Sequence, residues 1–249
     1  MPTTDDAERA VPITASSLVT MPGAGSDGDY AARATAPLAD ALAVPAIAVD
    51  PGPSGIVATY LAALDEAATR GPVIAAGISI GACVAVHWAA AHPRSCAAVV
   101  AACPPWHPGG DGGTSPAATA ARITVAEIDR TGLAAATATM RASSPAWLAD
   151  ELGRSWTVLG DLLAPHLREA ASTTLPRPDD LRRLAECRIP TAVVSVADDA
   201  VHPAEVASAW AAVLGVTPVS VAFDAWAGDP GALGRAAMDA LGRRADPAR

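Results

Sequence analysis

A serine stands between two glycines in the pentapeptide GISIG at residues 77–81, after the strand-like run Val73–Ala76 and before an Ala-rich helical stretch. A sharp turn from strand to helix presents a serine hydroxyl at the edge of a sheet, where a nucleophile is needed. The glycines avoid clashes with the neighbouring strand and helix, and the helix N-terminus favours developing negative charge. The spacing predicts that Ser79 is a nucleophile; the competing interpretation is a chance match in a Gly-rich chain.

A base and an orienting acid are the next requirement, and the segment DDAVHP at residues 198–203 offers both. It follows the predicted strand Thr191–Ala197, so its side chains belong at the carboxyl edge of a parallel sheet, where ligands bind. Asp199 is predicted to orient the base, and Asp198 to cap the turn. His202 is the first candidate for the base, although it could serve only as a helix-entry residue.

Other histidines are weaker candidates. His107 follows the predicted strand Cys96–Cys103 at the same edge and is the second candidate for the base. His87 and His92 lie further along the helix after Ser79 and are interpreted as structural. His166 is expected to be exposed. If His107 and His202 both fail, the serine has no conventional base.

Acyl transfer also needs hydrogen-bond donors for the oxyanion of the tetrahedral intermediate, and backbone amides suffice. The amide of Ile80 is one candidate. The turn PGAG at residues 22–25 ends the predicted first strand at the same edge, so the amide of Gly23 or Ala24 is the other. An ordinary strand-to-helix turn would explain that segment equally well.

Aromatic and sulfur-containing side chains are expected to shape a substrate pocket rather than to react. Plain packing is the alternative for each. Arg141 and Arg154 in the predicted lid could meet an acidic substrate, but solvated helix faces explain them more simply. The candidates for the pocket are Trp106, His107, Met140 and Trp147, with Trp156 nearby.

Composition removes several function classes. The 249 residues include no Lys, and all 17 basic residues are Arg, which excludes a pyridoxal Schiff base and a phosphate-loop lysine. The net charge of −9 argues against nucleic acid and anionic membranes as partners. The four cysteines have no zinc-site spacing and are interpreted as buried apolar residues. We therefore expect a small-molecule substrate, no metal and no cofactor.

Strand-like and helical stretches alternate through most of the chain, which predicts an α/β fold with a mainly parallel sheet of about six strands and helices on both faces. The strands are expected at residues 13–20, 45–49, 73–76, 96–103, 191–197 and 219–223. The helices between them are expected at 30–43, 55–69, 80–91, 179–186, 203–214 and 230–243. Residues 106–177 break the alternation and are predicted to form a helical lid, so that 1–105 and 178–249 form the core.

The elbow, the glycine turn after the first strand, the lid and the DDAVHP segment together resemble the α/β-hydrolase fold superfamily, in particular its compact esterase, lactonase and thioesterase-like members. The resemblance covers nearly the whole chain. It implies Ser79 as nucleophile, Asp199 as triad acid, and Ile80 with the Gly23 turn as oxyanion hole. The chain departs from the family pattern at the catalytic histidine. The family places this residue in the loop after the last strand, and residues 224–230 here read DAWAGDP, without a histidine.

Three functions therefore remain open. The first is a serine hydrolase acting on an ester, thioester or lactone through an acyl-Ser79 intermediate. The second is a non-hydrolytic enzyme of this fold, a lyase, acyltransferase or cyclase, and the third is a degenerate binding protein. The acidic start MPTTDDAERA has no secretory signal pattern, so a cytoplasmic location is expected, and the Ala-rich, Lys-free composition favours a GC-rich bacterial genome. Substrate identity and oligomeric state are left open.

Overall fold

A computed structural model describes residues 13–108 and 112–242 of the chain. The acidic N-terminal decapeptide, three residues of the Gly-rich loop (109–111) and Arg243 at the end of the predicted last helix lie outside this part. Among the described residues, no helix is long and apolar enough to cross a membrane.

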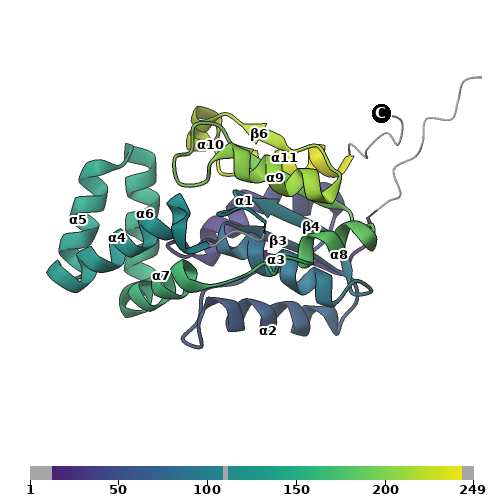
Figure 1. Cartoon of the computed structure of the whole chain (residues 1–249), viewed down its shortest axis with the longest axis horizontal. Helices are drawn as coiled ribbons and strands as arrows, with labels where there is room; N and C mark the ends of the chain where they lie inside the picture. Colours follow the sequence, from purple (N-terminus) through teal and green to yellow (C-terminus); the bar gives the residue numbers. More distant parts are fainter. Residues whose placement is uncertain (1–12, 109–111, 243–249) are drawn as a thin grey trace, which may run out of the picture.

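The centre of the molecule is a six-stranded parallel sheet in the order β2-β1-β3-β4-β5-β6 (Figure 1). Strands β1, β3, β4 and β5 are almost entirely buried, as expected of runs rich in Val, Ile and Ala that are covered on both faces. The prediction of a parallel sheet is confirmed. Its strands are β1 (Ser17–Met21), β2 (Ala46–Ala48), β3 (Val73–Ile78), β4 (Cys96–Ala102), β5 (Thr191–Val196) and β6 (Val219–Val221).

Helices cover both faces of the sheet, and each face has its own apolar core. One core contains residues of α1 (Gly28–Leu42) and α11 (Ala232–Gly242). The other contains residues of α2 (Ile56–Ala68), α3 (Ile80–Ala91), α8 (Asp180–Glu186) and α9 (Ala204–Leu214). These helices confirm the predicted layers, with ends that differ by one or two residues at most positions.

Two elements differ from the prediction. The first strand begins at Ser17 rather than Ile13, because Ile13–Ser16 precede the ladder that β1 forms with β3. The segment after β6 is a short helix, α10 (Phe223–Gly228), where a loop was expected. A six-residue helix has little stability of its own, so tertiary packing must hold α10.

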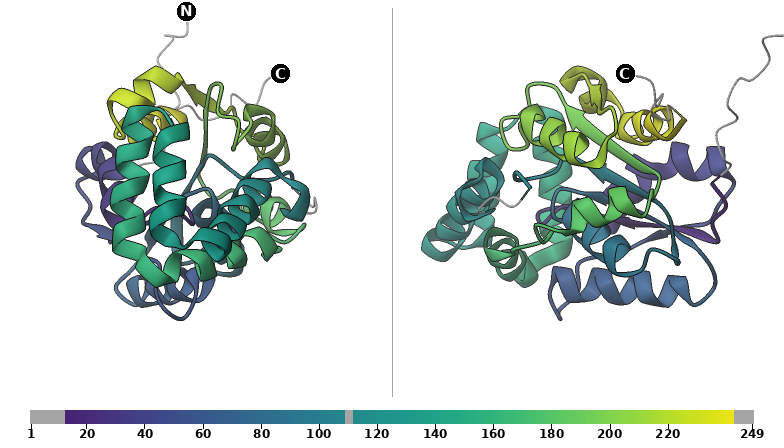
Figure 2. Two further views of the ribbon diagram at one scale, coloured as in Figure 1. Left: turned by 90° about the vertical axis from the view of Figure 1, so that its left-hand side faces the viewer. Right: turned by 45° about the vertical axis from the view of Figure 1, so that its right-hand side comes forward.

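The described residues between β4 and α8 form four α-helices and two short 3₁₀ turns. They are η1 (Gly112–Thr114), α4 (Pro116–Thr131), α5 (Leu133–Ser143), α6 (Ala146–Leu159), η2 (Gly160–Leu162) and α7 (Leu163–Ser172). Helices α4 to α7 gather beyond one end of the sheet (Figures 1 and 2). They enclose a third, smaller apolar cluster around Trp156, Leu159 and Leu163. This position places them over the carboxyl ends of the central strands.

Candidate active site

Ser79 sits at the turn between β3 and α3 with backbone angles of φ 56° and ψ −118°. A residue with a side chain adopts such angles only under strain, which neighbouring packing must hold in place. The two glycines permit that packing: a Cβ atom on Gly77 would lie 2.0 Å from the backbone of Gly81, and one on Gly81 would lie 2.4 Å from the carbonyl oxygen of Met21. The elbow is therefore closed on both sides by backbone.

His202 links Ser79 to Asp199 through its two ring nitrogens. The Nε2 atom of His202 lies 3.0 Å from the Oγ of Ser79, and its Nδ1 atom lies 2.9 Å from Oδ2 of Asp199. Both side chains are mostly buried, with 17% of His202 and 8% of Asp199 exposed. Serine hydroxyl, imidazole and carboxylate thus form one hydrogen-bonded chain at the edge of the sheet.

The other oxygen of Asp199 fixes the loop. Oδ1 accepts hydrogen bonds from the backbone amides of Val201 at 2.8 Å and His202 at 3.2 Å. Burial alone would raise the pKa of Asp199, but the hydrogen bond and charge of His202 and these two amides hold the pKa below its usual value. An ionised Asp199 accepts a hydrogen bond from the N–H at Nδ1, which leaves the Nε2 lone pair facing the serine hydroxyl.

The turn after β1 lies against the elbow. A Cβ atom on Gly23 would be 3.4 Å from the Cβ of Ser79, so the Gly23 and Ala24 backbone borders the serine. Ile80 is the first residue of α3, and the first amides of a helix have no acceptor within the helix. The three residues predicted for the oxyanion hole therefore gather around Ser79.

The remaining histidines lie elsewhere. His107 is exposed and does not line the cavity that contains Ser79. His87 pairs with Asp180 at 2.8 Å, and His92 stacks on Trp88, so both have structural contacts. The expectation of an exposed His166 is wrong: it is buried between α7 and the core, and its Nε2 lies 2.9 Å from the carbonyl oxygen of Gly52.

A cavity of about 290 Å³ opens above Ser79 between the sheet and the helices α4 to α7. Trp106 and Trp147 line this cavity, as predicted. Met140 does not line it and packs instead against the apolar cluster around Trp156. The chain has six Trp, two Tyr and one Phe. Six of these nine aromatic side chains line the cavity, namely Tyr30, Trp106, Trp147, Trp156, Phe223 and Trp226.

Three of the aromatic rings pack edge to face. Trp147 of α6 lies 4.9 Å from Trp226 and 5.7 Å from Phe223 between ring centroids, and Phe223 lies 5.8 Å from Trp226. The indole nitrogen of Trp226 donates to the phenol oxygen of Tyr30 at 2.6 Å. Burial raises the pKa of that phenol, which keeps it neutral. We call Tyr30, Trp147, Phe223 and Trp226 the aromatic wall.

Sequence reasoning missed Tyr30, Phe223 and Trp226. The available signal was their scarcity, because a chain with only nine aromatic residues is expected to use them where large apolar area is needed. Their convergence on one cavity depends on contacts between α1, α6 and α10, which no local pattern encodes.

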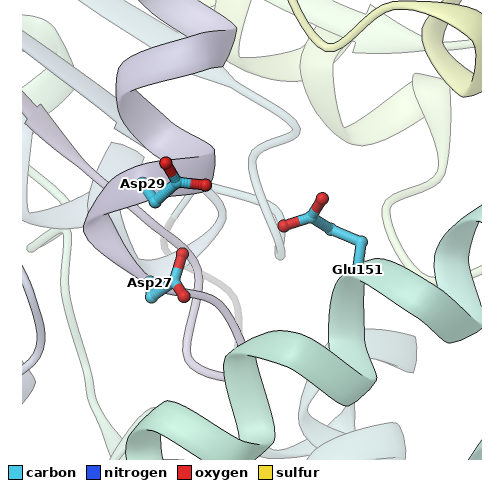
Figure 3. Close-up of side chains that lie close together, drawn as sticks. All are labelled: Asp27, Asp29 and Glu151. Atoms are coloured by element: carbon cyan, nitrogen blue, oxygen red, sulfur yellow. The ribbon is translucent and has the colours of Figure 1, made fainter.

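Glu151, which also lines the cavity, belongs to an ion-pair network between α6 and the start of α1. Figure 3 shows its carboxylate facing those of Asp27 and Asp29. Arg33 holds both oxygens of Glu151 at 2.8 Å, and Arg154 holds both oxygens of Asp27 at 2.6 and 2.8 Å. Two guanidinium groups thus occupy the places that a cation would take, and the carboxylates serve as their partners.

The cysteines fit the expectation in three cases of four. Cys83, Cys96 and Cys103 are buried, and burial raises the pKa of each thiol, that of Cys96 to about 12. The prediction is wrong for Cys187, which is exposed where α8 ends. The three buried thiols are poor nucleophiles because a raised pKa keeps them protonated.

Comparison with solved structures assigns the fold. A hydrolase from Oleispira antarctica superposes with a TM-score of 0.62 at 14% identity, over 93% of this chain and 92% of that one. An esterase from Thermogutta terrifontis gives 0.62 at 17% identity over 91% and 86%. MenH from S. aureus gives 0.57 at 13% over 83% and 84%. No family model and no curated protein matches the sequence. The chain has the α/β-hydrolase fold, as its motifs predicted.

Proposed function

We propose that this protein is a serine hydrolase that cleaves a carboxylic ester, thioester or lactone through an acyl-Ser79 intermediate. The observation that carries the proposal is the continuous contact from Ser79 Oγ to His202 Nε2 and from His202 Nδ1 to Asp199. A base within hydrogen-bond reach of a strained serine, itself oriented by a buried carboxylate, is the arrangement used for acyl transfer on unrelated folds.

In the first half of the reaction, His202 removes the proton from Ser79 as its oxygen attacks the substrate carbonyl carbon. The carbonyl electron pair moves to oxygen, and the amides of Ile80 and the Gly23–Ala24 turn are placed to stabilise that oxyanion. The imidazolium then gives its proton to the leaving alcohol or thiol as the carbonyl re-forms. Asp199 stabilises the positive charge on His202 without taking the proton.

In the second half, a water molecule attacks the acyl-enzyme. His202 accepts the proton of the water and returns it to Ser79, so acid is released and the starting state is restored. Ser79, His202, Asp199 and the oxyanion-hole amides serve both halves of the reaction.

The contact between His202 and Ser79 favours this function over a degenerate binding protein, since that alternative rested on a serine without a base. The names of similar solved structures, a hydrolase and esterases among them, point the same way. The base lies three residues after the acid, on the loop after β5, rather than on the segment after β6.

A fluorophosphonate probe tests the proposal, because it reacts with an activated serine whatever the natural substrate is. Wild-type protein should be labelled at Ser79, and Ser79→Ala should not be labelled. In His202→Ala the labelling rate should fall by about 10³-fold or more. His107→Ala is the matched control and should stay within about twofold of wild type. No labelling of the wild type, or equal loss in both histidine variants, would refute the assignment.

A further inference from the structure

Six of the nine aromatic side chains surround the cavity above Ser79, although aromatic residues make up only 4% of the chain. The other three, Tyr60, Trp88 and Trp210, are fully buried in the core. Aromatic area is thus divided between the core and this one cavity. We infer that the substrate of the proposed hydrolase carries an uncharged aromatic ring, in its acyl or alcohol part, that packs on the aromatic wall; this inference rests on the proposed function.

The polar atoms of several rings are already bonded within the protein. The indole N–H of Trp226 and the hydroxyl of Tyr30 are paired with each other at 2.6 Å. The indole N–H of Trp106 donates to the carbonyl oxygen of Leu175 at 2.8 Å. Trp106 and Trp226 therefore offer ring faces and edges to a ligand rather than hydrogen bonds, and the Tyr30 hydroxyl keeps its own O–H as a donor.

The geometry of the wall favours a ring over an alkyl chain. Trp147, Phe223 and Trp226 pack at interplanar angles of 64°, 71° and 85°. Such edge-to-face packing directs ring edges and ring faces in different directions, and a further ring can meet either in a favourable orientation. An alkyl chain would gain only the free energy of burying its apolar surface, without the additional attraction between aromatic rings.

Charge excludes an ionised substrate group. Among the described residues that line the cavity, none is Arg, so an anion on the ring has no guanidinium partner there and would meet the carboxylate of Glu151. A cation is disfavoured because Arg33 and Arg154 already pair with that carboxylate. The volume of about 290 Å³ lies just below the range for small-molecule pockets, about 300–1,000 Å³. A one- or two-ring ester suits these limits.

The test measures binding rather than turnover, so it is independent of the proposed chemistry. Ser79→Ala protein is titrated calorimetrically with 1-naphthyl acetate and methyl 1-naphthoate, and with the decahydro form of each, which has the same skeleton without ring electrons. At least one aromatic ester should bind about 5–10-fold more tightly than its decahydro form. Acetylcholine serves as the cationic comparison. Hydrolysis of these esters by the wild type is assayed separately and tests the proposed function.

Variants of the wall sharpen the result. Phe223→Leu and Trp226→Leu, each in the Ser79→Ala protein, should reduce the aromatic preference to about twofold or less. Leu148→Ala is the matched control, because Leu148 lines the same cavity beside Trp147 and its loss should weaken aromatic and decahydro esters equally. Equal binding of both forms, binding of neither, tighter binding of acetylcholine, or a preference that survives both wall variants would overturn the inference.

Discussion

The cavity has two walls that are built in different ways. The reactive wall, formed by Ser79, His202, Asp199 and the Gly23 turn, comes from the ends of the neighbouring strands β1, β3 and β5. Asp199 and His202 are fixed by contacts within their own loop. The aromatic wall comes from α1, α6 and α10, which are far apart in the sequence. Strand ends position the reacting atoms, and helix packing decides what they meet.

This division predicts that the two walls can be damaged separately. Changes in the reactive wall should abolish chemistry and leave the fold intact. Changes in the aromatic wall or its supports should alter stability and ligand preference while the serine keeps its reactivity.

The largest effect is expected for Asp199→Asn. An asparagine can still accept the amides of Val201 and His202 through its oxygen, but its NH₂ group then faces Nδ1 of His202. That arrangement favours the tautomer with a proton on Nε2, which cannot accept the proton of Ser79. We expect kcat for a reactive aryl ester to fall by about 10³–10⁴-fold, with little change in Tm.

Asp198→Asn is the control for this change, since the structure gives Asp198 no contact with the imidazole. Its kcat should stay within about twofold of wild type. A similar loss in both variants would mean that the loop, rather than the Asp199 carboxylate, carries the effect.

Asp27→Asn should have the next largest effect, and on stability. Asp27 is 2% exposed, caps α1 by accepting the Tyr30 amide, and binds Arg154 of the lid. The substitution removes the negative charge that Arg154 pairs with. Water partly compensates because Arg154 is 38% exposed, so we expect a loss of about 2–3 kcal/mol in the free energy of unfolding. Urea denaturation at pH 7 measures it.

The pH dependence gives a second check on Asp27. Burial would raise the pKa of Asp27, but the hydrogen bond from Arg154, the Tyr30 amide and the Arg154 charge outweigh it and lower the pKa. The folded state therefore binds this proton more weakly than the unfolded state, and its stabilising contribution is present above about pH 4 and is lost as the pH falls further. The difference between wild type and Asp27→Asn should shrink in that range; a constant difference would contradict it.

A smaller effect is expected for Trp226→Phe. The substitution keeps a ring against Trp147 and Phe223 but removes the N–H that bonds to Tyr30, leaving a buried hydroxyl without its donor. We expect a loss of about 1–2 kcal/mol in stability by urea denaturation. Fluorophosphonate labelling of Ser79 should stay within about twofold, because the reactive wall is untouched; a loss of labelling would show that the walls are coupled.

The smallest effect is expected for Trp156→Phe. The indole N–H of Trp156 is buried and has no hydrogen-bond partner among the described residues. Replacing the indole therefore removes an unpaired donor along with some apolar area, and the two changes oppose each other. The free energy of unfolding should change by less than about 1 kcal/mol, and less than in Trp226→Phe measured alongside. A larger loss of stability in Trp156→Phe than in Trp226→Phe would refute the contribution that we assign to the hydrogen bond between Trp226 and Tyr30.

The sequence was informative where structure is local. The elbow at Ser79 follows from glycines that no side chain can replace, since a Cβ at either position would meet backbone at 2.0 or 2.4 Å. The strands follow from buried β-branched runs. The proximity of Asp199 and His202 was readable because they are three residues apart on one loop.

The rest depended on tertiary contacts. DAWAGDP after β6 contains Gly and Pro and is too short for a helical pattern, yet α10 forms because Trp226 and Phe223 pack on Trp147 of a distant helix. His166 and Arg154 were expected to be exposed or solvated, and each instead bonds to a segment outside α4 to α7, His166 to Gly52 and Arg154 to Asp27. No periodicity within the lid predicts which of its faces meets the core.

The position of His202 bears on how the base of such a site is recognised. In this chain no histidine follows the last strand. Here the pattern Asp-x-x-His after the penultimate strand places an imidazole 3.0 Å from the serine. Asp199 and His202 therefore lie within four consecutive residues, so both partners of the imidazole contact are carried by one loop.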